Sequence, residues 1–387
     1  MTLREEVFVI GVGMSRFGGP ARPFDGRIME AALEALDDAS IPYREVEALY
    51  LGTVFSPPTL GQGVVKDLGL TGLPVVRVEN ASATGGAAFY EAVQAVGSGR
   101  VEVAMALGFD DPAMGQSANF NDVSLRGTPA PMIEPGVPPM AFFAMWAVRR
   151  MADHGTTIET LAKIAMKNWN NARHNPKAER QADAPVTLDQ VLKSRMLAYP
   201  HTARMAAPQG AGSAAAIVCS RAALDRLGRS GAVKVVAAQA QSERYVDGHL
   251  FAGAVVGPPE MAHRGAFAAY EEAGLGPTDL RVLAFHDAYA IEELLYYEEV
   301  GLCGPGEGDR LVHDGVTELG GRWPTSTDGG FIGRGHPAGP TGLAQIWELA
   351  QQLRGRAGGR QVERPTNGLA HIIGAGSVCY THILQAV

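Results

Sequence analysis

Short apolar runs alternate along the chain with segments whose apolar residues recur at helical spacing. The first run, residues 7–12, predicts a strand, and residues 27–39 have the spacing of an amphipathic helix. The same test predicts strands at 48–52, 75–78, 102–108, 214–219, 233–238, 282–285 and 370–373. It predicts helices at 85–96, 142–154, 158–171, 221–227, 261–273, 290–300 and 339–353. This alternation is typical of an α/β protein with a mostly parallel sheet covered on both faces.

The pattern changes between about residues 111 and 209, which are rich in Met, Pro and Asn and show no clear strand. We interpret this part as an inserted, largely helical segment. A second β/α pass begins at residue 233 and repeats the element order of the first, which indicates duplication of one unit. The predicted divisions are an N-terminal half (1–112 and 210–230), a loop domain (113–209) and a C-terminal half (231–387).

The composition of the 387 residues narrows the classes of function. A hydrophobic fraction of 46% supplies a sizeable core, and the net charge of -8 argues against nucleic acid as a partner. No apolar stretch of membrane-spanning length and no signal peptide is expected. The three cysteines are widely spaced, which argues against a disulfide framework or a zinc site and favours a cytoplasmic location.

The segment around Ser82 predicts a strand that ends in a sharp turn and opens a helix. Residues 78–86 read VENASATGG, with small residues on both sides of the serine. Two interpretations are open. Ser82 is either a reacting group at a strand-to-helix elbow, or an ordinary serine that caps the helix.

Histidines mark two further candidate positions. His286, Asp287 and Tyr289 follow an apolar strand, where ligands of α/β sheets gather. The histidine could donate to an oxyanion or act as a base, and a phenol of lowered pKa could act as a base; alternatively, Asp287 caps a helix beside a half-buried tyrosine. His336 lies in the glycine-rich run 329–342, which predicts either a histidine of defined direction or a tight connection with a solvated ring. His371 and Cys379 are expected to be structural.

Together these motifs resemble the thiolase superfamily, most closely the sterol carrier protein-type and lipid-transfer-protein thiolase-like members. The motifs are ASATG at 81–85, GFDD at 108–111, HDAY at 286–289 and GHPAGPTG at 335–342, which occur in the family's order and span nearly the whole chain. The resemblance implies the thiolase fold, a duplicated five-layered α-β-α-β-α architecture with an inserted loop domain. It also implies an acyl-CoA thioester as substrate, no separate cofactor, and a homodimer paired at the sheet edge near Asn80.

This chain departs from the family at residues that carry out the family's chemistry. Ser82 stands where the family has its nucleophilic cysteine, and the second family cysteine falls near Ile372. A serine needs a strong base beside it to attack a thioester. His286 and His336 carry over as groups aimed at the thioester oxygen, and Tyr289 replaces a phenylalanine of the family motif. Tyr289, helped by Tyr245, is the expected proton acceptor, and Ser82 then serves mainly to cap the helix or to space the substrate.

These departures lead to a retro-aldol hypothesis. Cleavage of a 3-hydroxyacyl-CoA to a ketone or aldehyde plus a short acyl-CoA needs no acyl-enzyme. Aldolases of steroid side-chain degradation resemble this chain and work with a partner that joins an OB-fold to a zinc ribbon, so such a partner is expected. The alternatives are an acyltransferase that uses Ser82 and a non-catalytic acyl-CoA-binding subunit. Aromatic and methionine residues of the loop domain either line a bulky substrate site or form plain core; they are Met140, Phe142, Phe143, Met145, Trp146, Met151 and Trp169.

Overall fold

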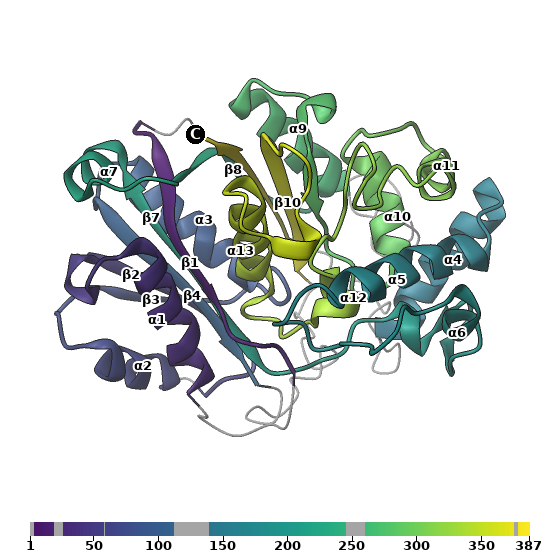
Figure 1. Cartoon of the computed structure of the whole chain (residues 1–387), viewed down its shortest axis with the longest axis horizontal. Helices are drawn as coiled ribbons and strands as arrows, with labels where there is room; N and C mark the ends of the chain where they lie inside the picture. Colours follow the sequence, from purple (N-terminus) through teal and green to yellow (C-terminus); the bar gives the residue numbers. More distant parts are fainter. Residues whose placement is uncertain (1–3, 19–25, 58, 112–138, 245–259, 375–377) are drawn as a thin grey trace.

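The computed structural model describes residues 4–18, 26–57, 59–111, 139–244, 260–374 and 378–387 (Figure 1). Its described strands form one mixed nine-stranded sheet and one small two-stranded sheet. In order across the large sheet, the strands are β3 (Val75–Val78), β2 (Ala48–Gly52), β4 (Val103–Asp110), β7 (Gly212–Ser220), β1 (Val7–Met14), β8 (Val233–Ser242), β11 (Val378–Ala386), β10 (Asn367–Gly374) and β9 (Val282–Ala284).

The strand order confirms the predicted duplication. In each half, the first strand of the pass lies innermost and the last strand lies beside it: β1 with β7, and β8 with β11. The two halves join where β1 pairs antiparallel with β8, in the register Val7↔Val235 to Val9↔Val233. The second strand of each half pairs in parallel with its neighbours, β2 with β3 and β4, and β9 with β10. The other pairings of the large sheet are antiparallel, because the first and last strands of each half run against their neighbours, so the expectation of a mostly parallel sheet is wrong.

Helices cover both faces of the sheet, as expected of the thiolase fold. The central layer consists of α3 (Thr84–Gly97) and α13 (Thr341–Leu353), which pack against each other and against strands of both halves. The outer helices are α1 (Arg27–Ala39), α2 (Leu60–Leu68) and α7 (Arg221–Leu227) on the N-terminal half and α9 (Glu260–Ala273) on the C-terminal half. Strand β1 is apolar throughout because both of its faces are buried. Val7 and Val9 face the central helices, while Phe8 and Ile10 face α1.

The two central helices approach so closely that their first turns have no room for side chains. A Cβ on Gly342 would lie 2.2 Å from the backbone nitrogen of Gly86, and a Cβ on Gly85 would lie 2.7 Å from the carbonyl oxygen of Gly339. Such distances are far below van der Waals contact, so glycine is required at these positions. This contact brings together the turns that carry Ser82 and His336.

The described part of the inserted segment is largely helical, as predicted. It comprises α4 (Pro139–His154), α5 (Ile158–Ala172), α6 (Leu188–Leu192) and a short antiparallel pair, β5 (Met196–Ala198) with β6 (His201–Thr202). That pair was not expected, because two or three residues are too few to show an alternating pattern. The segment packs on the C-terminal half through α10 (Ala290–Glu299), α11 (Gly308–His313) and α12 (Gly330–Arg334).

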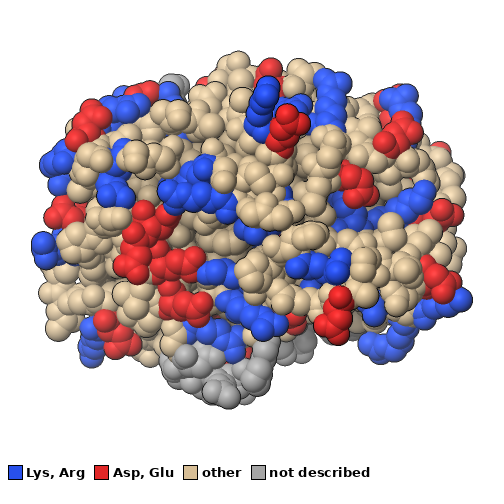
Figure 2. Space-filling view, in the orientation of Figure 1, with Lys and Arg blue, Asp and Glu red and all other residues tan. Residues whose placement is uncertain are grey.

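Two surface features bear on partners. Basic and acidic side chains intermingle over the face seen in Figure 2. Strand β3 forms one edge of the large sheet, and its Val75 and Val76 are 41% and 45% exposed. Among the described residues, no helix is both long and apolar enough to cross a membrane.

Candidate active site

Ser82, His286 and His336 come together where the two halves meet. Ser82 lies at the turn before α3, and the preceding Ala81 adopts a left-handed backbone (φ 48°) that few non-glycine residues adopt. The oxygen of Ser82 lies 3.1 Å from Nε2 of His336. The ring centroids of His336 and His286 are 5.6 Å apart, and Phe331 lies against both rings. The structure thus assembles three of the five predicted site residues.

Ser82 does not cap the helix, so that interpretation is wrong. Helix α3 begins at Thr84, and the position before it, Ala83, offers no side-chain cap. Instead, the hydroxyl of Thr84 accepts from the amide of Asn80 (2.8 Å) and donates to the carbonyl of Ala81 (2.6 Å). Because Thr84 holds the turn, the Ser82 hydroxyl is free to bond His336.

The hydrogen bonds around His336 define which of its nitrogens carries the proton. The hydroxyl of Thr341 donates to the carbonyl of Pro337, so it accepts from Nδ1 of His336 at 3.1 Å. Nε2 then carries the lone pair and accepts from the Ser82 hydroxyl. Burial, His286 and Arg334 lower the pKa of His336 well below 6.5, so the ring is neutral at pH 7. In this state Nε2 of His336 is a proton acceptor, which differs from the expectation that both histidines are aimed at the thioester oxygen as donors.

His286 differs from His336 in the partners of its ring nitrogens. It is buried, its Nδ1 lies 2.7 Å from Oε1 of Glu292, and its Nε2 has no partner among the described residues. Burial lowers the pKa of His286 to about 3 and raises that of Glu292 well above 4.5. The sequence analysis did not single out Glu292. It could have been found, because an acidic residue in the first turn of an apolar helix, six residues after a candidate histidine, indicates a partner for that histidine.

Tyr289 lies beside the site but differs from the expected base. Its ring stacks on Phe143 at 4.8 Å and meets His201 edge-on at 5.3 Å. Burial, with a smaller contribution from Glu292, raises the pKa of Tyr289 to about 12. The phenol is therefore protonated at pH 7, and the expected lowered pKa is wrong in direction. Tyr245, its expected helper, lies outside the described residues.

Asp287 does not cap α10, which begins instead with a box made by Tyr289 and Glu292. Its carboxylate accepts from the backbone amide of Phe331 at 2.7 Å and from Asn168 at 2.8 Å. Asp287 thereby holds α12, the short helix that forms within the glycine-rich run and presents Phe331 to both histidines. The glycine-rich run thus contains a helix as well as turns.

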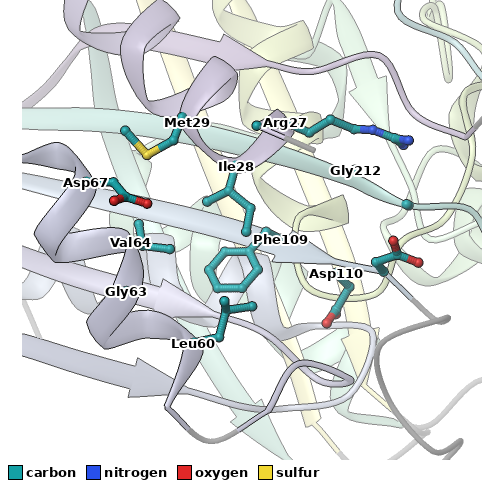
Figure 3. A pocket seen from close by; sticks show the side chains of 13 residues that line it. Arg27, Ile28, Met29, Leu60, Gly63, Val64, Asp67, Phe109, Asp110 and Gly212 are labelled. Carbon is teal, nitrogen blue, oxygen red and sulfur yellow. The ribbon is translucent and has the colours of Figure 1, made fainter. Parts of the chain in front are cut away.

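A carboxyl group at the end of β4 holds the turn after His336. Asp110, at the end of β4, accepts from the amide of Gly339 at 2.6 Å and from the hydroxyl of Thr53 at 2.9 Å. It lines a cavity of about 200 Å³ with residues of α1 and α2, and Figure 3 shows Phe109 and Asp110 at its wall. Burial raises the pKa of Asp110 to about 6.

Among the described residues, no thiol lies at this cluster. Ile372 packs beside Ala83 and Phe331, where the second cysteine of the family was expected to fall. Cys379 lies elsewhere, buried against His371 (3.3 Å), and burial raises its pKa to about 12. Cys219 is likewise a buried strand residue. Of the aromatic residues predicted in the loop domain, Trp146 belongs to the core, whereas Phe143 reaches Tyr289.

Comparison with known families agrees with this architecture. Residues 27–206 match the family described as "Thiolase, N-terminal domain" and residues 256–386 match "Thiolase C-terminal domain-like". The chain therefore belongs to the thiolase superfamily.

Among curated proteins, the chain is 36% identical to Sterol carrier protein 2 of Bos taurus, covering 97% of this chain and 71% of that protein. It is 35% identical to Benzoylsuccinyl-CoA thiolase subunit BbsB of Thauera aromatica, covering 97% and 96%. It is 34% identical to an Acetyl-CoA acetyltransferase of Methanothermobacter thermautotrophicus, covering 98% and 99%. Within the superfamily it is an SCP2-thiolase-like acyl-CoA enzyme.

Solved structures share the fold as well, among them an aldolase and a thiolase. That of the "Ltp2-ChsH2(DUF35) aldolase" superposes with a TM-score of 0.82 at 24% identity, covering 100% of this chain and 99% of that one. Human mitochondrial 3-ketoacyl-CoA thiolase in complex with CoA superposes with a TM-score of 0.73 at 18% identity, also covering 100% and 99%.

Proposed function

We propose that this chain is a retro-aldolase that cleaves a 3-hydroxyacyl-CoA, such as one carrying a steroid side chain, into a ketone or aldehyde and a shorter acyl-CoA. The observation that carries the proposal is that the described residues place no thiol at the cluster of Ser82, His286 and His336. Acyl transfer through Ser82 would form an oxygen ester, from which return to a thioester is uphill. Cleavage of a 3-hydroxy thioester needs a proton acceptor and an oxyanion donor, and His336 and His286 fit these roles.

The proposed step moves one proton and breaks one carbon–carbon bond. Nε2 of His336 takes the proton of the substrate's 3-hydroxyl, whose oxygen forms the new carbonyl. The Cα–Cβ bond breaks, and its electron pair enters the thioester enolate, whose oxygen accepts from Nε2–H of His286. The phenol of Tyr289 then gives its proton to Cα, and the proton held by His336 restores it.

The deciding experiment compares the wild type with Ser82→Ala on a branched 3-hydroxyacyl-CoA, with product acyl-CoA and carbonyl compound measured together. We expect the variant to keep turnover within about tenfold, because Ser82 makes no covalent bond in this mechanism. A loss of about a thousandfold, with a labelled acyl group trapped on Ser82 in the wild type, would establish the acyltransferase instead. This second function is favoured by one observation, the 3.1 Å contact of Ser82 with His336.

Tyr289→Phe tests the proton donor. The substitution keeps the ring that stacks on Phe143 and removes only the hydroxyl, so we expect turnover to fall by about a hundredfold with little change in KM. Tyr90→Phe is the matched control, because Tyr90 packs edge-on against Tyr380 outside the three-residue cluster. Equal turnover of Tyr289→Phe and the wild type would remove Tyr289 from the mechanism.

The partners are also part of the proposal. The similar aldolase structure is named as Ltp2 together with ChsH2(DUF35), which supports the expectation of an OB-fold/zinc-ribbon partner, so the assays are run with and without it. The exposed valines of the edge strand β3 support a homodimer paired at that edge. Acyl-CoA binding without turnover, whatever partner is added, would favour a non-catalytic subunit.

A further inference from the structure

A buried carboxyl group connects His286 to Tyr289 within the site. Glu292 is fully buried at the first turn of α10. Its Oε1 lies 2.7 Å from Nδ1 of His286, and its Oε2 accepts from the backbone amide of Tyr289 at 3.0 Å. The two oxygens thus have different partners, one a ring nitrogen and the other an amide donor.

These partners match the two oxygens of a carboxylic acid. The oxygen that faces an amide N–H must accept, which suits the carbonyl oxygen of the acid. The oxygen that faces a ring nitrogen can then be the hydroxyl and donate to Nδ1. In that arrangement the single proton of the neutral imidazole lies on Nε2, which has no partner among the described residues.

Burial disfavours a bare carboxylate beside a neutral ring, and it outweighs the amides of Tyr289 and Ala288 and the hydroxyl of Tyr296, which favour the charged form of Glu292. In the described part of the chain, His286 is the one ion-pair partner of Glu292. The other titratable groups near the pair are Tyr289, Tyr296, His336 and His371. Burial raises the pKa of both tyrosines and lowers that of both histidines, so all four are neutral at pH 7 and cannot balance a negative charge.

We infer that Glu292 is a positioning residue, a carboxylic acid that donates to Nδ1 of His286 and thereby keeps a proton on Nε2. His286 then presents an N–H donor to the thioester oxygen without carrying a charge. That catalytic consequence rests on the proposed retro-aldol function, whereas the proton positions belong to the resting protein. The same group also fixes the backbone of Tyr289, so one side chain orients two members of the site.

The test combines two variants with a spectroscopic measurement. Glutamine is the neutral mimic, because its amide oxygen can accept from Tyr289 while its NH₂ group donates to His286. Glu292→Met has similar size and no hydrogen bond. We expect Glu292→Gln to keep turnover within about fivefold and Glu292→Met to lower kcat by about a hundredfold with little change in KM, the cost of a misplaced oxyanion donor.

The spectroscopic measurement is ¹⁵N NMR of histidine-labelled resting protein, with the His286 signals identified by their loss in His286→Gln. Wild type and Glu292→Gln should both show Nδ1 unprotonated and Nε2 protonated. A proton on Nδ1 in the wild type, or a kcat loss in Glu292→Gln as large as in Glu292→Met, would overturn the inference. If no 3-hydroxyacyl-CoA is cleaved, the proposed function fails, and the NMR result still decides the proton positions.

Discussion

Replacing His336 with alanine should lower the turnover of the 3-hydroxyacyl-CoA by about a thousandfold, the range typical of a lost general base. His336 is the one imidazole of the site whose lone pair faces the reacting region, because Thr341 fixes the proton on the other nitrogen. The nearby phenol of Tyr289 cannot take over as proton acceptor, because burial raises its pKa to about 12 and it stays protonated at the assay pH. The measurement is steady-state release of the shorter acyl-CoA.

The pH dependence of kcat gives an independent readout of the same residue. His336 acts in its neutral form, so turnover falls as the pH is lowered through its pKa in the folded protein. Because that pKa is depressed well below 6.5, the acid limb of the profile should begin well below pH 6.5 rather than near it. An acid limb centred at pH 6.5 or above would contradict the assignment of His336 as the base.

His382→Gln is the matched control for the loss of a buried histidine. His382 lies on β11, where its Nε2 donates to the carbonyl of Gly86 at 3.2 Å, and glutamine can keep a donor there. Its turnover should stay close to that of the wild type. Equal losses in His336→Ala and His382→Gln would indicate that packing, and not proton transfer, explains the effect.

Replacing Gly342 with alanine should lower the free energy of unfolding by about 3 kcal/mol, a large effect for one methyl group. The added Cβ would lie 2.2 Å from the backbone nitrogen of Gly86, and backbone on both sides leaves no flexible side chain to move aside. Helices α3 and α13 must separate, which also displaces Ser82 from His336. We therefore expect unfolding at a lower urea concentration and a lower turnover.

The control is the same substitution in a helix with free space. Gly63 lies in α2, and a Cβ there would have no described atom within 4 Å. Gly63→Ala should raise stability by about 0.5–1 kcal/mol, because alanine favours the helical backbone. If Gly342→Ala were as stable as the wild type, the close packing of α3 and α13 would be wrong.

Most of the fold could be predicted from the sequence. The expected strands and helices recur within a few residues, for example the helix predicted at 221–227 and found as α7 (Arg221–Leu227). The reason is that a long periodic segment carries its own signal. Short elements such as α12 and the β5–β6 pair were missed because so few residues show no period, and tertiary contacts such as the Asp287 carboxylate stabilise them.

For the candidate site, the sequence predicted which residues belong to it but not what each of them does. Motif order pointed to Ser82, His286, Tyr289 and His336 from separate parts of the chain. Their roles depended on contacts and burial that a motif does not show, so the expected capping by Ser82 and the expected lowered pKa of Tyr289 were both wrong. The hydroxyl of Thr84 holds the turn instead, and burial of the Tyr289 phenol, with a smaller contribution from Glu292, raises its pKa to about 12.

The sequence by itself determined that this is a duplicated α/β chain of the thiolase type with a serine at the nucleophile position. Periodicity is a local property and suffices for the alternating elements and their repeat, whereas the thiolase type and the place of Ser82 followed from the resemblance of four motifs to the family. Only the tertiary structure decided which groups hold protons. The proton positions on His336 and the environment of His286 follow from Thr341, Glu292 and the exclusion of water, and desolvation arises only once distant segments pack together.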